Sequence, residues 1–243
     1  MKKILALVLA LAMVLSLAAC SSTPAESAAP TDAPAESAEA PAESADAPAD
    51  NAEPSVINVC LASEPDTIDP ALNSAVDGAT LTAHLFSGLA KWAQDENGNL
   101  EIVADAATEL PEGVTNEDGT VTYTYTLRDG MTWSDGQPVT AGDFAFAWKR
   151  AASTALAADY GYMFEVVDGY ADVWATDDAG NYVNPDAELN VVALDDKTLQ
   201  VTLSNAVAYW NELLAFPAYF PVREDVVANE AWATDPSTYV CNG

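Results

Sequence analysis

Residues 21–55 contain almost no side chain that a folded core could bury. The segment is mainly Ala, Pro, Ser, Glu and Asp, and imperfect copies of Pro-Ala-Glu-Ser-Ala begin at Pro24, Pro34 and Pro41. Such a composition cannot offset the entropy lost on ordering, and the carboxylates repel one another. The sequence therefore predicts a disordered acidic linker over 21–55, which confines folding to residues 56–243.

The first 20 residues have the layout of a bacterial export signal. Lys2 and Lys3 precede an apolar run that ends at Leu17 and is short for a bilayer-spanning helix. Small residues then lead to Cys20, as a lipoprotein cleavage site requires. We expect residues 1–20 to be a lipoprotein signal peptide, and the lipid on Cys20 to hold the mature chain on the extracytoplasmic face of the cell membrane, at the cell surface or in the periplasm. An ordinary secreted protein with a cysteine near its cleavage site is the alternative.

Residues 56–243 have the composition of a globular domain and are numerous enough to bury a core. They hold 30 acidic and six basic side chains, a net charge of −24. This charge argues against binding to nucleic acid and against docking on an anionic lipid surface. Cys60 and Cys241 could form a disulfide in an oxidising compartment or remain thiols, and the sequence leaves both open.

Hydrophobic periodicity predicts strands and helices in the first half of this domain. Val56 to Ala62 alternates and predicts a strand. A helix is expected from Asp77 or Thr80 to Leu89, because leucines recur there at every fourth position. Val121 to Arg128 alternates apolar residues with threonines, which predicts a half-buried strand.

The second half continues with a capped helix, a hairpin and a short helix. Thr140 and Asp143 have the spacing of a capping box, and the helix that follows carries an apolar stripe of Phe144, Trp148 and Ala151. Residues 190–193 and 198–203 predict a hairpin, and a short helix is expected around 209–215. Strands and helices interleave without a strict βαβ repeat, so we expect an α/β fold with mixed strand directions.

The sequence offers no constellation of catalytic or metal-ligating residues. No nucleophile elbow, zinc-protease, phosphate-loop or dinucleotide motif is present, and the one histidine, His84, is expected on a helix surface. Asp95 to Asn99 and Asp177 to Asn181 resemble calcium loops only faintly and are better explained as turns, since the later bidentate glutamate is missing. We therefore expect a non-enzymatic binding module with no cofactor and no metal. Most tryptophans should be core anchors, although one or two could line a ligand cleft.

Three motifs resemble those of bacterial extracellular solute-binding protein family 5, which binds oligopeptides, dipeptides and nickel. The first is Ser63-Glu64-Pro65-Asp66-Thr67-Ile68-Asp69-Pro70, and the second is His84-Leu85-Phe86-Ser87-Gly88-Leu89. The third and longest runs from Tyr123 to Phe144, YTYTLRDGMTWSDGQPVTAGDF. The resemblance covers essentially all of residues 56–243 and is closest to the oligopeptide-binding lipoproteins.

This resemblance implies a two-lobed, type II periplasmic-binding-protein-like fold that closes over its ligand. Binding proteins for peptides add the backbone of an extended ligand to strand edges. Counting from Asp69, the backbone contacts of the first lobe are expected at Ser74, Ala75 and Val76, and Tyr160 and Tyr162 resemble a segment that faces the cleft. The implied partners are an oligopeptide ligand and the permease and ATPase subunits of an ABC importer.

The family is more than twice as long as residues 56–243. We therefore expect only the first, N-terminal lobe to be present, in a truncated form that binds peptide weakly or not at all by itself. A dipeptide, a nickel chelate or another small solute are alternative ligands. A cell-surface receptor or adhesin module that takes no part in transport is an alternative function.

Overall fold

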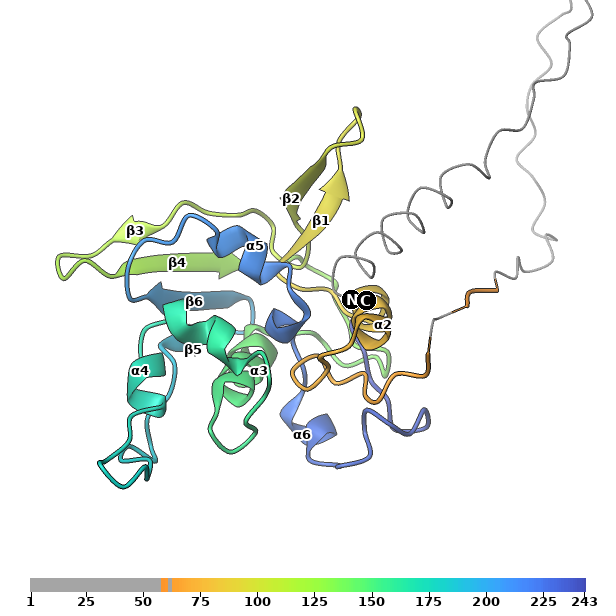
Figure 1. The fold of residues 1–243 in the computed structure, drawn as a ribbon. Helices are drawn as coiled ribbons and strands as arrows, with labels where there is room; N and C mark the ends of the chain where they lie inside the picture. The colour runs from red at the N-terminus through yellow and green to blue at the C-terminus, as the bar shows by residue number, and fades with distance from the viewer. Residues whose placement is uncertain (1–57, 61–62) are drawn as a thin grey trace, which may run out of the picture. The chain divides into compact units, whose positions relative to one another are not determined.

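The computed structural model describes residues 58–60 and 63–243. Residues 57–243 group into one unit, and Figure 1 shows how its strands and helices alternate along the chain. The predicted signal peptide, the linker and most of the predicted first strand lie outside the described residues. The described part of that strand, Asn58 to Cys60, has no regular secondary structure. No helix in the described ranges has the length and hydropathy needed to cross a membrane.

The central element is a four-stranded sheet in the order β3-β4-β6-β5. Its strands are β3 (Val114–Thr115), β4 (Val121–Thr126), β5 (Val191–Ala193) and β6 (Thr198–Leu203). Strand β4 pairs with β6 from Val121↔Leu203 to Thr126↔Thr198. The inward residues Leu199, Val201 and Leu203 are fully buried, so the strand and the hairpin predicted from alternation are confirmed.

The expectation of mixed strand directions is wrong for the described strands, because every pairing among them is antiparallel. Two hairpins, β3–β4 and β5–β6, bring in neighbouring strands through tight turns, which only antiparallel strands allow. A separate hairpin is formed by β1 (Ala90–Gln94) and β2 (Leu100–Ala104). The interleaving of helices with strands that defines the α/β class is confirmed.

Helix α2 (Val76–Leu85) ends four residues earlier than the leucine spacing predicts. Phe86 is extended, and its ring packs into the core together with the fully buried Leu89. Gly88 lies so close to the ring of Phe220 that a Cβ atom there would be 2.6 Å from a ring carbon. Leu89 therefore reaches the core from a non-helical segment between α2 and β1.

Helix α3 (Ala141–Ala152) begins at the predicted capping box. The Thr140 hydroxyl accepts a hydrogen bond from the Asp143 amide, and the Asp143 carboxylate accepts one from the Thr140 amide at 2.8 Å. The predicted stripe of Phe144, Trp148 and Ala151 is buried. This stripe faces the sheet, since α3 packs against β5 and β6.

Short elements complete the fold around α3. They are η1 (Gly161–Val166), α4 (Tyr170–Val173), α5 (Trp210–Leu214), η2 (Pro217–Tyr219) and α6 (Glu224–Val227). Helix α5 confirms the short helix expected around 209–215.

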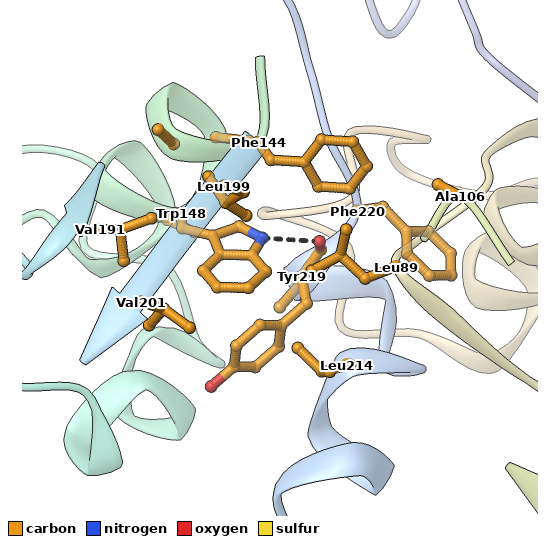
Figure 2. Packing of buried hydrophobic residues seen from close by; sticks show 14 of the residues in the cluster. Leu89, Ala106, Phe144, Trp148, Val191, Leu199, Val201, Leu214, Tyr219 and Phe220 are labelled. Atoms are coloured by element: carbon orange, nitrogen blue, oxygen red, sulfur yellow. Dashed lines mark hydrogen bonds between the residues drawn. The ribbon is translucent and has the colours of Figure 1, made fainter. Parts of the chain in front are cut away.

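An aromatic cluster fills the space between α3, the sheet and η2 (Figure 2). The Trp148 ring lies edge-on to Tyr219, with centroids 5.1 Å apart, and Phe164 stacks on Tyr219 at 4.2 Å. The indole N–H of Trp148 donates to the Tyr219 carbonyl at 2.7 Å, and that of Trp210 donates to the Tyr125 hydroxyl at 2.7 Å. Both of these buried indole donors are therefore paired, as a buried tryptophan requires.

Candidate functional site

A buried ion pair holds the first family motif in place. The carboxylate of Asp69 is only 2% exposed and accepts two hydrogen bonds from the Arg150 guanidinium, at 3.2 and 2.7 Å. The same carboxylate accepts a hydrogen bond from the Ala71 amide at 2.9 Å. Arg150 lies in the last turn of α3, so this helix fixes the Asp69-Pro70 turn and the chain that follows it.

The chain then exposes Ser74, Ala75 and Val76, the residues expected to contact ligand, of which Val76 is already the first residue of α2. The buried side chain of Asn73 accepts a hydrogen bond from the Ala75 amide and donates one to the Ala75 carbonyl. Ala75 has φ −108° and ψ 151° and precedes the first turn of α2. Gly78 lies against Asn73 so closely that a Cβ atom would clash with its amide oxygen. The Asn73 side chain therefore fixes the position of the Ala75 backbone.

Ser74 has a free backbone in this arrangement. Within the described residues, neither its amide nor its carbonyl has a hydrogen-bond partner. The stretch differs from the expectation in one respect: it belongs to no strand and borders neither sheet. The backbone amide and carbonyl of Ser74 could pair with an extended peptide. They are held in place by the side chain of Asn73, whereas we expected them to lie on the edge of a sheet.

Tyr160 and Tyr162 lie at the start of η1. Tyr160 is half-buried and meets Phe216 edge-on at 5.0 Å, whereas Tyr162 is 54% exposed with its ring 6.3 Å from that of Tyr160. Phe216 directly precedes η2, and η2 also packs against α2. Tyr160 therefore adjoins the segment that leads into η2, and no described hydrogen bond or ring contact joins Tyr160 or Tyr162 to Ser74, Ala75 or Val76.

The C-terminal residues dock on two of the family motifs. The Asn242 side chain accepts a hydrogen bond from the Ser87 amide and donates one to the Ser87 carbonyl, each at 3.0 Å. The Ser134 amide donates to the Cys241 carbonyl at 2.8 Å. Cys241 has a free thiol, so the open question of a Cys60–Cys241 disulfide is answered in the negative here.

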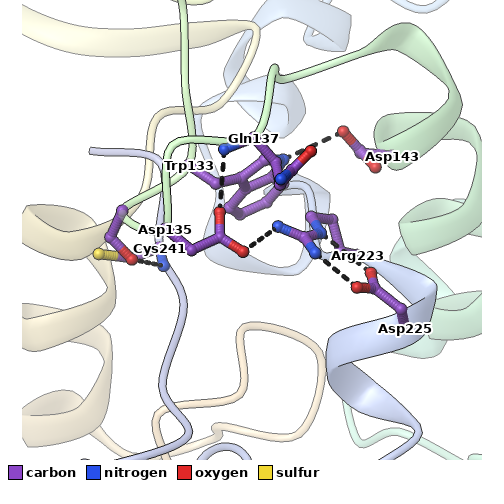
Figure 3. Close-up of polar contacts among 8 residues, drawn as sticks. Trp133, Asp135, Gln137, Asp143, Arg223, Asp225 and Cys241 are labelled. Atoms are coloured by element: carbon purple, nitrogen blue, oxygen red, sulfur yellow. Dashed lines mark hydrogen bonds and ion pairs between the residues drawn. The ribbon is translucent and has the colours of Figure 1, made fainter.

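Arg223 is the centre of an ionic cluster beside this segment (Figure 3). Its guanidinium pairs with Asp135 at 2.6 Å and with Asp225 at 2.5 Å. A backbone hydrogen bond from Gln137, together with Arg223, lowers the pKa of the Asp135 carboxyl. Burial raises the pKa of the nearby Asp143 carboxyl, although it accepts hydrogen bonds from Thr140 and Trp133. Each of the three carboxylates of the cluster therefore has a hydrogen-bonding or ionic partner.

The remaining chemical candidates have structural explanations. His84 is exposed on α2, and its Nδ1 lies 2.7 Å from the Thr80 carbonyl. Asp95 and Asp177 each use their carboxylate to close a turn through Asn99 and Asn181. In the described part of the chain, no three His, Cys, Asp or Glu side chains are grouped as metal ligands would be.

Comparison with known proteins assigns the family. Residues 101–243 match the family described as "Bacterial extracellular solute-binding proteins, family 5 Middle", which is more than half of the chain. The chain belongs to this family. Its members are solute-binding proteins, and the resemblance drawn from the sequence motifs is thereby confirmed.

Individual family 5 proteins align with the described domain. The oligopeptide-binding protein OppA of Bacillus subtilis is 34% identical over 192 residues, which are 78% of this chain and 32% of that protein. The probable deoxycholate-binding periplasmic protein YgiS of Escherichia coli is 35% identical, with 74% and 32% covered. Listeria monocytogenes OppA bound to peptide has a TM-score of 0.59 at 34% identity, with 73% and 33% covered. The fold is therefore periplasmic-binding-protein-like, and the chain spans about a third of the length of the curated relatives it matches.

Two contributors to the candidate site were missed in the sequence. Asn73 and Phe216 position the predicted ligand residues, yet each looked like an ordinary loop residue. The only local signal was the glycine five residues after Asn73, which leaves room for the asparagine side chain. For Phe216 no periodic pattern existed, because it lies between two short helices.

Proposed function

We propose that this chain is part of an extracytoplasmic substrate-binding lipoprotein of an ABC importer and that it contacts oligopeptides. The observation that carries the proposal is the exposed backbone of Ser74, whose amide and carbonyl have no partner within the described residues. An extended peptide can pair with such groups whatever its side chains are. Family membership and the similarity to oligopeptide-binding relatives support the same ligand.

The binding surface can be mapped by NMR on the isotope-labelled mature chain carrying Cys20→Ser. We expect a mixture of tri- to pentapeptides to shift the amide signals of Ser74 to Val76 and of Tyr160 to Tyr162. Affinity should be weaker than about 10 µM, because one set of backbone contacts must offset the whole cost of association.

Two substitutions of one residue sharpen this experiment. Ser74→Pro removes the open amide donor and should abolish the shifts, whereas Ser74→Ala keeps the donor and should bind like the parent protein. Equal binding by both variants would contradict the proposal, provided that their thermal unfolding matches the parent. Shifts of the same amides by a dipeptide, a nickel chelate or deoxycholate, and not by longer peptides, would assign the site to a different solute.

The membrane attachment proposed for Cys20 has its own test. In a bacterial host, Cys20→Ser should abolish incorporation of labelled palmitate and move the protein from the membrane fraction to the soluble fraction. Cys60→Ser is the matched control and should still take up label. A parent protein that takes up no label would support the alternative of an ordinary secreted protein.

A further inference from the structure

Two asparagines in the chain, Asn97 and Asn242, are followed directly by glycine. In such a pair the glycine nitrogen can attack the carboxamide carbon of the asparagine, because glycine has no Cβ atom to hinder the approach. The attack forms a succinimide ring and releases ammonia, which takes the proton of the glycine N–H. Water then opens the ring at either carbonyl and leaves an aspartate or an isoaspartate. The two pairs have the same sequence but different surroundings.

Asn97 lies at the tip of the β1–β2 hairpin (Figure 1), in the turn from Asp95 to Asn99. Asn97 and Gly98 are exposed, and a Cβ atom on Gly98 would meet no atom within 4 Å. The Gly98 amide donates to the Asp95 carbonyl at 3.0 Å, and the Asp95 carboxylate accepts hydrogen bonds from the amides of Asn97 and Asn99. Hydrogen bonds from Asn99 lower the pKa of Asp95 most, and the contact with the Asn97 carboxamide lowers it least. The Asn97 side chain is therefore weakly held and can turn toward the Gly98 nitrogen.

Asn242 is held at both ends of its carboxamide. Its Oδ1 accepts a hydrogen bond from the Ser87 amide and its Nδ2 donates one to the Ser87 carbonyl, each at 3.0 Å. The Gly243 amide donates to the Leu85 carbonyl at 2.9 Å, and a Cβ atom on Gly243 would be 2.8 Å from the carbonyl carbon of Leu85. Ring closure at Asn242 would break both side-chain hydrogen bonds. Each glycine amide makes one backbone hydrogen bond, so the asparagine side chains distinguish the two pairs.

We propose that Asn97 is a site of spontaneous deamidation in the folded protein and that the tertiary structure protects Asn242. The carboxylate formed at Asn97 lies beside Asp95 and Glu96 in the sequence, so it repels the carboxylate that closes the turn. An isoaspartate also lengthens the main chain within the turn and distorts the hydrogen bond from Gly98 to Asp95. Strands β1 and β2 form a sheet of their own, so the pairing of β4 with β6 does not depend on this turn.

Ageing of the mature chain carrying Cys20→Ser in warm, mildly alkaline buffer tests the proposal. Mass spectrometry of proteolytic peptides records a gain of about 1 Da at each deamidated asparagine. In the folded protein we expect Asn97 to convert at least about tenfold faster than Asn242, because Asn242 must first leave its contacts. In concentrated urea, which removes those contacts, the two rates should agree within about threefold. Equal rates in the folded protein would overturn the proposal, and a difference that persists unchanged in urea would contradict protection by the fold.

Two variants of Asn97 locate the reaction and its effect. Asn97→Gln should remove the acidic species that anion-exchange chromatography separates from the aged protein, because the longer glutamine side chain closes its ring much more slowly. Asn97→Asp reproduces the aspartate product and should shift the NMR amide signals of Asp95 to Asn99, whereas those of β4 and β6 should stay in place. Acidic species that form equally in Asn97→Gln would show that the reaction takes place at another residue.

Discussion

Replacing Arg150 with alanine is expected to lower the free energy of unfolding by about 3–5 kcal/mol, because it leaves a buried carboxylate without its partner. Asp69 is 2% exposed and Arg150 16% exposed, so solvent cannot take over the role of the guanidinium. Urea unfolding followed by circular dichroism measures the change. The same variant should weaken any ligand response at Ser74 to Val76, since Asp69 also accepts a hydrogen bond from the Ala71 amide in the turn that precedes these residues.

The residue before Arg150 supplies a matched control. Lys149 pairs with Glu188 at 2.6 Å, but both side chains are about a third or more exposed. Lys149→Ala should therefore cost less than about 1 kcal/mol. The double variant Asp69→Ala with Arg150→Ala should lose less stability than the two single variants added together, because it leaves no unpaired charge. Equal losses for Lys149→Ala and Arg150→Ala would show that burial of the Asp69 pair adds no stability of its own.

Truncation of Trp148 to alanine should destabilise the domain by about 3–5 kcal/mol. The indole is fully buried and contacts the rings of Phe164, Trp210 and Tyr219. Its removal opens a cavity between α3 and the sheet and leaves the Tyr219 carbonyl without its donor. Urea unfolding again reports the loss, and the fluorescence spectrum should lose the contribution of a buried indole.

Two further substitutions separate the contributions of ring volume, hydrogen bonding and burial to the loss of stability. Trp148→Phe keeps much of the ring volume but removes the N–H donor, so it should cost less than the alanine variant. Trp92→Ala, on strand β1, removes a ring that is 52% exposed and should change stability by about 1 kcal/mol or less. A Trp92 effect as large as that of Trp148 would contradict the assignment of the core to the cluster in Figure 2.

Sequence patterns correctly predicted the strands and the helix that are determined by residues close together in the sequence. The alternation from Val121 to Leu127 and the inward set of β6 were correct, because in these strands every second side chain faces the core. The capping box at Thr140 was correct for the same reason, since both of its hydrogen bonds join residues three positions apart. The predicted ligand residues Ser74 to Val76 are exposed, but the extended conformation of Ala75 is held by the Asn73 side chain and not by a sheet.

The predictions failed where contacts between residues far apart in the sequence determine the local structure. The leucine spacing would continue α2 to Leu89, yet the chain leaves the helix at Phe86, where Ser87 pairs with Asn242, 155 residues away in the sequence. The prediction of mixed strand directions was wrong for the described strands. Hydrophobic periodicity indicates where a strand lies, but it does not indicate which strand it pairs with or in which direction.

The sequence by itself determined the family, the strand from Val121, the later hairpin, the capped helix and the excess of negative charge, because motifs, periodicity and charge can each be read along the chain. Only the tertiary structure decided that Arg150 neutralises Asp69, that Phe216 supports Tyr160 and that the backbone of Ser74 is left open. These contacts join residues far apart in the sequence, and whether a polar group is paired, buried or available to a ligand depends on all of its neighbours in space.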